Sequence, residues 1–190
     1  MYSLAQKIEF ENIANPHSWF LVSSELHEQA KLLKQVATSK ITKRSESDSN
    51  SWLSSNRSVI LLAGFALENV IKAYLVYENP EFVAEGALSR EIQTHRLTKL
   101  ANRSQLLPYK VRGLKTLTYY EDGLESWARY PCGLNWTKTR EQSLLDQRSW
   151  DNYLWLMRAY ELRFKKLMKV GWKGDHDFAG RFEIEGNWLS

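Results

Sequence analysis

Residues 59–67, Val-Ile-Leu-Leu-Ala-Gly-Phe-Ala-Leu, form the longest apolar run of the chain. A helix over this run is hydrophobic on all sides, and such a helix is typically buried at the centre of its fold. The pattern becomes amphipathic beyond the run, and Asn79-Pro80 ends it, because the residue before a proline disfavours helical geometry. The sequence therefore predicts a central helix that begins near Ser51 and ends near Glu78.

Apolar residues that recur every three or four positions predict further helices on both sides of the central one. Asn15-Pro16 favours a helix start, with asparagine as the N-cap and proline at the first helical position. We expect a long first helix from there to about residue 37, a short helix capped by Thr94, and two more over about 111–128 and 143–170.

Two segments lack a helical pattern. Residues 38–51 are polar and rich in serine, which is typical of an exposed loop. Residues 171–190 contain four glycines and a short alternation at 182–185, which suggests one short strand in an otherwise irregular tail. The fold prediction is therefore an all-α bundle of four to five helices over residues 1–170, followed by a C-terminal tail over residues 171–190.

Length and composition are those of an ordinary soluble domain: 190 residues, 43% hydrophobic and 25% charged. The single cysteine, Cys132, rules out an internal disulfide framework and fits a reducing compartment. The run at 59–67 is too short to span a bilayer, and the N-terminal residues carry no signal-peptide pattern. We therefore predict a cytoplasmic protein without a membrane partner, and we exclude secreted, membrane-spanning and disordered classes.

Charge is distributed unevenly along the chain, whose net charge is +4. The first 95 residues carry 9 Lys and Arg against 11 Asp and Glu, and the remaining 95 carry 17 against 11. Six basic residues between 96 and 115 have no acid among them, and a second basic cluster lies at 158–169. The basic half indicates either a polyanionic partner or a solvated surface that the acidic half balances in the folded protein.

Histidines are too few and too dispersed for an evident metal site. His17 and His27 would be about 80° apart around one helix and several turns apart along it, so they cannot share a metal. Asp175-His176-Asp177 offers possible ligands, although a solvated turn is the preferred interpretation of this glycine-rich tail. The sequence predicts no metal and no cofactor.

Three polar residues outside the basic clusters are candidates for a site. Glu68 follows the apolar run, and Lys72 is four residues later, in the favourable order for a helical ion pair. The two form either a surface pair at the rim of the buried stretch or a polar group in a cleft between helices. His95 either packs or caps a short helix or faces the basic segment that begins at Arg96.

Three motifs occur in order along the chain. They are Ala63-Gly-Phe-Ala-Leu-Glu68-Asn-Val-Ile-Lys72-Ala73-Tyr74-Leu, Thr94-His95-Arg96-Leu97-Thr98-Lys99-Leu100 and Arg129-Tyr130-Pro131. They resemble the HEPN superfamily (higher eukaryotes and prokaryotes nucleotide-binding domains): the first resembles the signature of its second helix, the second its step into the third helix, and the third a segment before its last long helix. The resemblance extends over roughly residues 16–170.

The resemblance implies a helical bundle that pairs as a homodimer and acts in a bacterial defence or toxin–antitoxin system. Some HEPN members are metal-independent ribonucleases with an arginine and, four to six residues later, a histidine near the start of the last long helix. This chain has no histidine between His95 and His176, so that helix lacks the pair. Arg90 and His95 have the right spacing but precede the third helix.

Three functions follow as hypotheses. The preferred one is a non-catalytic HEPN-like module that binds RNA, a nucleotide or a partner protein. The alternatives are a metal-independent ribonuclease that uses Arg90 and His95, and a pure interaction subunit that pairs with the product of a neighbouring gene. For the first hypothesis, the expected phosphate contacts are Arg96, Lys99, Arg112 and Arg129, and a base would stack on Tyr130 or Trp136.

Overall fold

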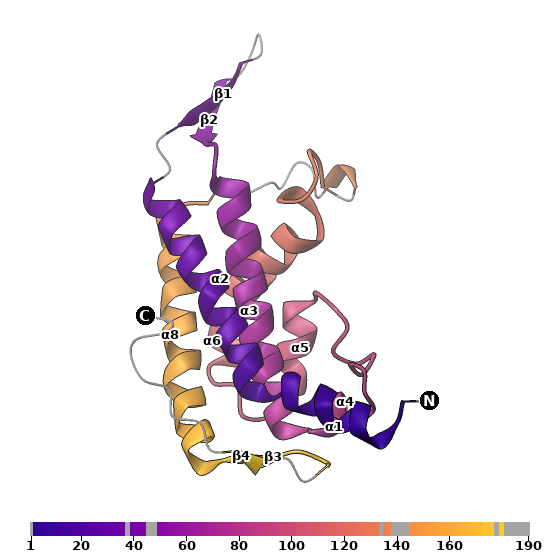
Figure 1. Ribbon diagram of the computed structural model, residues 1–190. Coiled ribbons are helices and arrows are strands. Elements are labelled where there is room, and N and C mark those ends of the chain that lie inside the picture. The colour runs from indigo at the N-terminus through magenta and orange to yellow at the C-terminus, as the bar shows by residue number, and fades with distance from the viewer. Residues whose placement is uncertain are drawn as a thin grey trace.

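The protein is an all-α bundle, as the sequence predicts (Figure 1). The computed structural model describes residues 2–36, 39–44, 49–133, 135–137, 145–176 and 179–180. Its helices are α1 (Leu4–Ile13), α2 (Pro16–Val36), α3 (Asn56–Glu78), α4 (Glu81–Ala84), α5 (Leu97–Arg103), α6 (Lys110–Asp122), the π-helix η1 (Gly123–Trp127) and α8 (Gln147–Val170).

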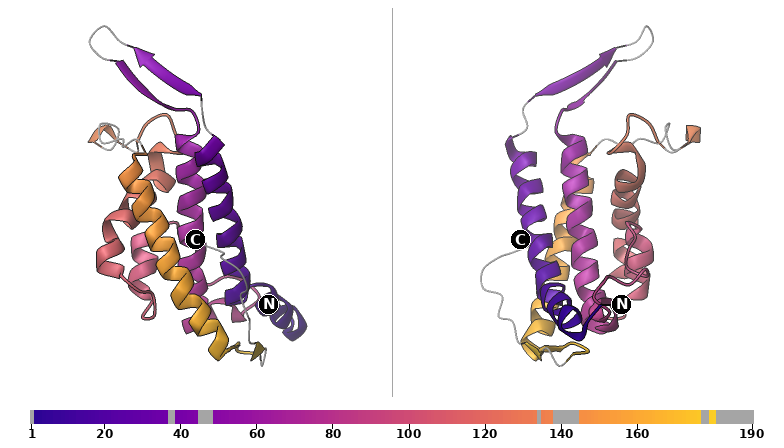
Figure 2. Two further views of the ribbon diagram at one scale, coloured as in Figure 1. Left: turned by 90° about the vertical axis from the view of Figure 1, so that its left-hand side faces the viewer. Right: turned by 45° about the vertical axis from the view of Figure 1, so that its right-hand side comes forward.

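Helix α3 forms the centre of the bundle and carries the apolar run. Helix α2 packs along it in the opposite chain direction, and α5, α6, η1 and α8 also contact it (Figure 2). Within the described ranges, α3 is the one helix long and apolar enough by composition to cross a bilayer, and most of its apolar stretch is buried inside the bundle. It begins five residues later than expected, after Ser55.

Glycines allow α3 and the α6–η1 helix to approach each other closely. A Cβ on Gly64 would lie 2.7 Å from Leu124 Cγ, and a Cβ on Gly123 would lie 2.5 Å from Ile60 Cγ2. Such contacts are too short for any side chain, so glycine is required on both helices. The expected helix over 111–128 is therefore present, but it changes to π geometry at Gly123 and ends at Trp127.

The expected loop at 38–51 is wrong. Its described residues form an antiparallel pair, β1 (Lys40–Arg44) with β2 (Ser49–Leu53), in which Lys40 lies opposite Leu53. The hairpin projects from the end of the bundle where α2 ends and α3 begins (Figures 1 and 2). Ile41 and Thr42 are β-branched residues that favour strands, a local signal hidden among the polar residues around them.

Helix α1 and the described strands after α8 lie at the same end of the bundle (Figure 1). Helix α1, which the sequence patterns did not indicate, begins with a capping box in which Ser3 accepts from Gln6 N and the Gln6 side chain accepts from Ser3 N. The C-terminal segment pairs β3 (Trp172–Lys173) with β4 (Ala179–Gly180), and the Trp172 indole donates to the Val76 carbonyl. The expected strand at 182–185 lies outside the described residues.

Candidate functional site

Glu68, Lys72 and His95 form a polar cluster, here called the Glu68 cluster, between α3 and the segment before α5. Lys72 Nζ lies 2.7 Å from Glu68 Oε1, and His95 Nδ1 lies 2.8 Å from Glu68 Oε2. Both oxygens of the carboxylate are therefore engaged, one by a residue of its own helix and one by the segment before α5. The structure thus brings together three residues that the sequence indicated separately.

The expected surface pair at Glu68 and Lys72 is wrong, because both side chains are buried. Only 6% of the Glu68 side chain and 7% of the Lys72 side chain are exposed. The Lys72 ammonium also lies 5.5 Å from the centre of the Trp19 ring, which provides a cation–π contact from α2. Their burial follows from the central position of α3, which contacts α2, α5, α6, η1 and α8.

His95 is the solvent-accessible member of the cluster, with 53% of its side chain exposed. A carboxylate can only accept hydrogen bonds, so Nδ1 carries the proton toward Glu68, and Nε2 of the neutral ring keeps its lone pair. The ring also meets Phe65 edge-on, at 5.9 Å between centroids. His95 does not cap α5. Its fixed tautomer suits it to accept or donate a proton at Nε2.

Arg90, the expected partner of His95, is exposed on the segment between α4 and α5. No polar contact among the described residues joins the two side chains. Lys99 is likewise exposed, on α5. The Arg90–His95 pair of the ribonuclease hypothesis is therefore not assembled within this chain.

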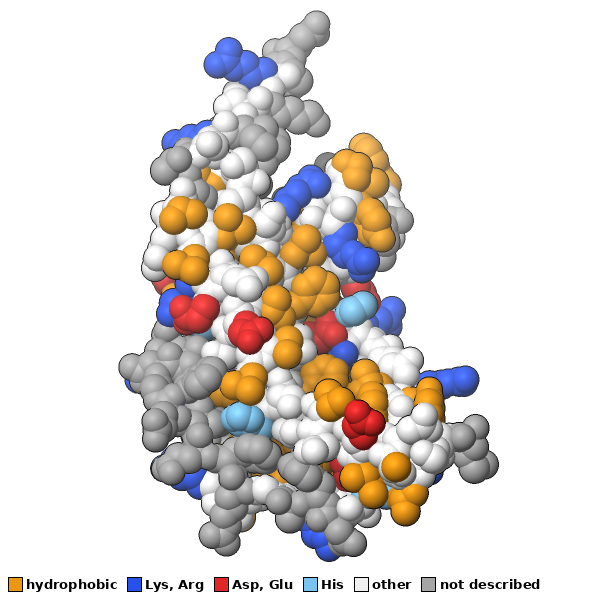
Figure 3. Space-filling model, viewed as in Figure 1, with side chains coloured by type: hydrophobic (Ala, Val, Ile, Leu, Met, Phe, Trp, Pro, Cys, Tyr) orange, Lys and Arg blue, Asp and Glu red, His pale blue; other side chains and the backbone are white. Residues whose placement is uncertain are grey.

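Four of the expected nucleic-acid contacts lie near η1 and the segment after it. Arg96 Nε lies 3.2 Å from Glu125 Oε1, so its charge is partly compensated. The Arg129 guanidinium lies 5.7 Å from the Tyr130 ring centre, and Arg57 donates to the Tyr130 carbonyl. Trp136 is 74% exposed. On the face that bears α2, α3 and α5, charges of both signs are interspersed around hydrophobic side chains (Figure 3).

Arg112 lies apart from that group, at the opposite end of the helix formed by α6 and η1. Its guanidinium carbon lies 4.1 Å from the centre of the Trp155 ring on α8, a close cation–π stack. Tyr109, which directly precedes α6, packs against the same ring, with centroids 5.2 Å apart. Arg112 is therefore the one expected phosphate contact that lies beside a pair of aromatic rings.

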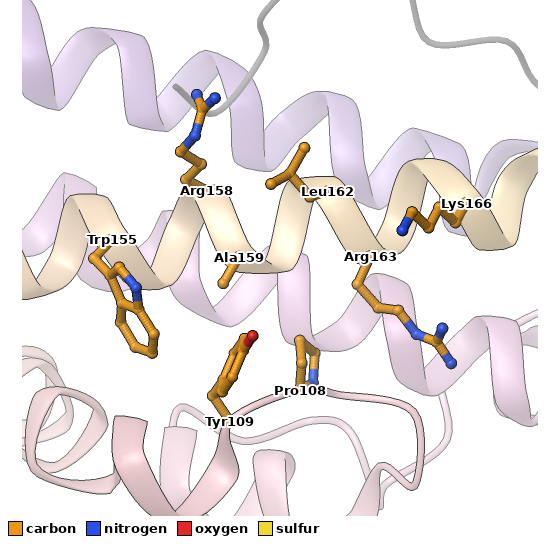
Figure 4. A pocket seen from close by; sticks show the side chains of 8 residues that line it. All are labelled: Pro108, Tyr109, Trp155, Arg158, Ala159, Leu162, Arg163 and Lys166. Carbon is orange, nitrogen blue, oxygen red and sulfur yellow. The ribbon is translucent and has the colours of Figure 1, made fainter.

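A pocket of about 510 Å³ opens between α8 and the segment before α6, here called the basic aromatic pocket (Figure 4). Pro108 and Tyr109 line one side of it, and α8 lines the other. The residues that α8 contributes are Trp155, Arg158, Ala159, Leu162, Arg163 and Lys166. None of the described lining residues is acidic, so the pocket combines three cations with exposed apolar and aromatic surface.

Tyr109 has an unusual backbone conformation at the edge of this pocket. Its φ is 56°, and it is the one described residue other than glycine with a positive φ. A left-handed conformation costs a bulky residue about 1 kcal/mol or more. This backbone conformation places the Tyr109 ring against Trp155 of α8, and the residue is 55% exposed.

Sequence patterns missed Tyr109 and Trp155 as site residues, although they found the basic cluster on the last helix. The inner face of α8 accounts for its large buried residues, but Trp155 does not belong to that stripe. It lies one turn from Arg158 and two turns from Leu162, which is 51% exposed. An aromatic residue on an otherwise basic, outward helix face was the signal that could have identified the pocket.

His27 is a buried histidine with a structural role. Its Nδ1 lies 2.7 Å from the hydroxyl of Tyr153, and no part of the residue is exposed. Burial, with a smaller contribution from the charge of Lys31, lowers the pKa of His27 to about 4.

We expect this pKa to make stability depend on pH. Above pH 6.5 His27 is neutral in both states; as pH falls from 6.5 to about 4, the unfolded chain binds a proton that the folded protein does not. The free energy of unfolding should therefore fall by up to about 3 kcal/mol over this range through His27 alone. Urea unfolding at a series of pH values measures it, with the variant His27→Leu as the reference.

In His27→Leu, the fall in the free energy of unfolding between pH 6.5 and about pH 4 should be smaller by up to about 3 kcal/mol, whatever the absolute stability of the variant. An identical loss in both proteins would contradict the assignment.

The possible metal ligands in the tail have other partners. His176 Nδ1 lies 2.9 Å from Glu11 Oε2, and the His176 amide donates to the same oxygen. Asp177 lies outside the described residues. Among the described residues, no group of three or more metal-ligating side chains is gathered at one place. The contact between Glu11 and His176 instead ties the C-terminal segment to α1.

Comparisons of this chain with protein-family models, with curated proteins and with solved structures give no match.

Proposed function

We propose that this protein is a non-catalytic, HEPN-like module that binds RNA, and that the basic aromatic pocket is its principal contact site. The observation that carries the proposal is the composition of that pocket. Arg158, Arg163 and Lys166 supply positive charge, and Tyr109 supplies an exposed ring for a base. Proteins that bind single strands combine these two elements, because cations track phosphates and rings stack on unpaired bases.

The mixed charge around Arg96 and Arg129 gives weaker support for the other expected contacts. Glu125 offsets Arg96, whereas no described residue that lines the basic aromatic pocket is acidic. The order of the three HEPN-like motifs and the all-α fold are consistent with the proposal. A homodimer and a partner protein from a neighbouring gene remain predictions.

The test is a titration of labelled single-stranded RNA by fluorescence anisotropy over a salt series. Binding should weaken as salt rises, because each phosphate contact releases counterions, with a slope of about −0.7 per contact on logarithmic axes. Affinity that does not change with salt, or no binding at low salt, would count against the proposal. A protein that is inert with RNA but forms a stable complex with a neighbouring gene product would favour the interaction hypothesis.

A metal-independent ribonuclease is the second candidate, and the geometry of His95 favours it. The buried Glu68 carboxylate holds the ring in one tautomer, as in catalytic acid–base pairs, and Nε2 is the free nitrogen. Arg90 would have to act from another chain, since it does not contact His95 here.

This candidate predicts that His95→Ala abolishes RNA cleavage measured in the presence of a chelator. Removal of a general acid or base typically costs about 10²- to 10⁴-fold in rate. Lys40→Ala, an exposed change on the projecting hairpin, serves as the control. Equal cleavage by His95→Ala and the parent, or no cleavage by either, would exclude the ribonuclease.

A further inference from the structure

Two further depressions lie beside the basic aromatic pocket. One, of about 460 Å³, follows the outer face of α6 and includes Arg112, which stacks on Trp155 of the pocket. The other, of about 270 Å³, lies between α6 and the start of α8, and it shares Lys115 and Tyr119 with the first. The pocket and these two neighbouring depressions are together called the α6–α8 groove here.

The α8 wall of this groove is a straight stripe along the helix. Its members recur at alternating steps of four and three residues, which places them on one face. They are Arg148, Asn152, Trp155, Ala159, Leu162 and Lys166. At 1.5 Å per residue, the stripe is about 27 Å long.

The α6 wall runs antiparallel to it. Tyr109, at the start of α6, lines the pocket with the second half of α8, whereas Tyr119 lines the depression of about 270 Å³ with Arg148 and Asn152. Arg112 and Lys115 lie between these two tyrosines. Cations therefore occur along the whole groove and not only in the pocket.

We infer that the α6–α8 groove binds single-stranded RNA lengthwise along α8, rather than a mononucleotide or a duplex. This inference rests on the proposed function and specifies its ligand. Six cations over about 27 Å exceed what one nucleotide can engage, so successive phosphates must occupy them. Asp122, in the depression of about 460 Å³, is the acidic side chain among the described lining residues.

The aromatic rings set the preference for a single strand. Tyr109 offers its exposed face at one end of the groove, and a ring face can stack only on a base that is free of its own neighbours. In a duplex the bases are already stacked and paired, so that contact is lost. A duplex would retain only its phosphate contacts.

The experiment compares labelled uridine mononucleotide, tetranucleotide and decanucleotide, and a duplex of the same length as the decanucleotide, by anisotropy over a salt series. We expect affinity to rise with single-strand length and the salt slope to steepen, from about −0.7 for one phosphate contact toward about −4 for six. The duplex should bind about tenfold or more weakly than the decanucleotide, which corresponds to one lost stacking contact.

The variant Arg148→Glu distinguishes binding along the whole groove from binding at its aromatic end alone. Arg148 is exposed in the first turn of α8, where an acidic residue favours the helix, so the variant is expected to fold. It should weaken the decanucleotide about tenfold and leave the mononucleotide unchanged, because the mononucleotide occupies only the aromatic end. The matched control is Lys40→Glu, on the projecting hairpin.

Three outcomes would overturn the inference. Equal affinity and equal salt slope for mononucleotide and decanucleotide would confine binding to the pocket and leave the proposed function intact. Equal affinity for the duplex would remove the single-strand preference. No binding of any of the four ligands would remove the proposed function together with this inference.

Discussion

Replacing Arg112 and Arg163 together with glutamate should weaken binding of single-stranded RNA about a hundredfold or more at low salt. Arg112 stacks on the Trp155 ring and Arg163 lines the same pocket, so the change reverses both charges that flank the aromatic pair. Each charge-assisted contact contributes about 1.5 kcal/mol or more. The salt slope should also become less steep by about 1.4, since two phosphate contacts are lost.

The control for this result is the double variant Lys40→Glu and Arg44→Glu on the hairpin. It changes the net charge by the same amount, and both side chains are exposed at a distance from α6 and α8. The account requires near-parental affinity for this control. An equal loss in both double variants would mean that overall charge, and not the pocket, attracts RNA.

Replacing Glu68 with leucine should lower the free energy of unfolding by about 3 to 5 kcal/mol. The change leaves the Lys72 ammonium buried without its counter-ion, and an uncompensated buried charge is costly. It also removes the acceptor of His95 Nδ1. Urea denaturation at neutral pH measures the loss.

The double variant Glu68→Leu and Lys72→Leu tests the reason for that loss. With both charges gone, no ammonium remains buried, and apolar replacements of buried pairs are often close to neutral. The double variant should therefore be more stable than the single one. If the two are equally destabilised, packing rather than charge explains the effect.

The sequence was sufficient to predict the class of fold and the central helix. The apolar run at 59–67 is stable only when it is buried in an interior. The helices around it are predicted by apolar residues that recur every three or four positions. The hairpin at 40–53 was missed because two short strands paired only with each other leave little hydrophobic pattern. Helix α1 was missed because its apolar face is weak, with Leu4 and Ile13 mostly exposed.

The candidate sites could be predicted only in part. Helical spacing alone pairs Glu68 with Lys72, but the approach of His95 depends on how the segment before α5 crosses α3. In the same way, the sequence identified Arg112 as an expected phosphate contact, whereas its stack on Trp155 depends on the antiparallel packing of α6 on α8. Both contacts join residues 27 or more positions apart through tertiary packing, which no local pattern encodes.

The most direct test of RNA binding in the α6–α8 groove is photo-crosslinking. A decanucleotide that contains 4-thiouridine is irradiated with the protein, and the crosslinked peptides are identified by mass spectrometry. The account predicts crosslinks at Tyr109 and Trp155, which the Arg112→Glu and Arg163→Glu double variant should abolish. Crosslinks confined to Tyr130 and Trp136, or to the hairpin, would contradict it.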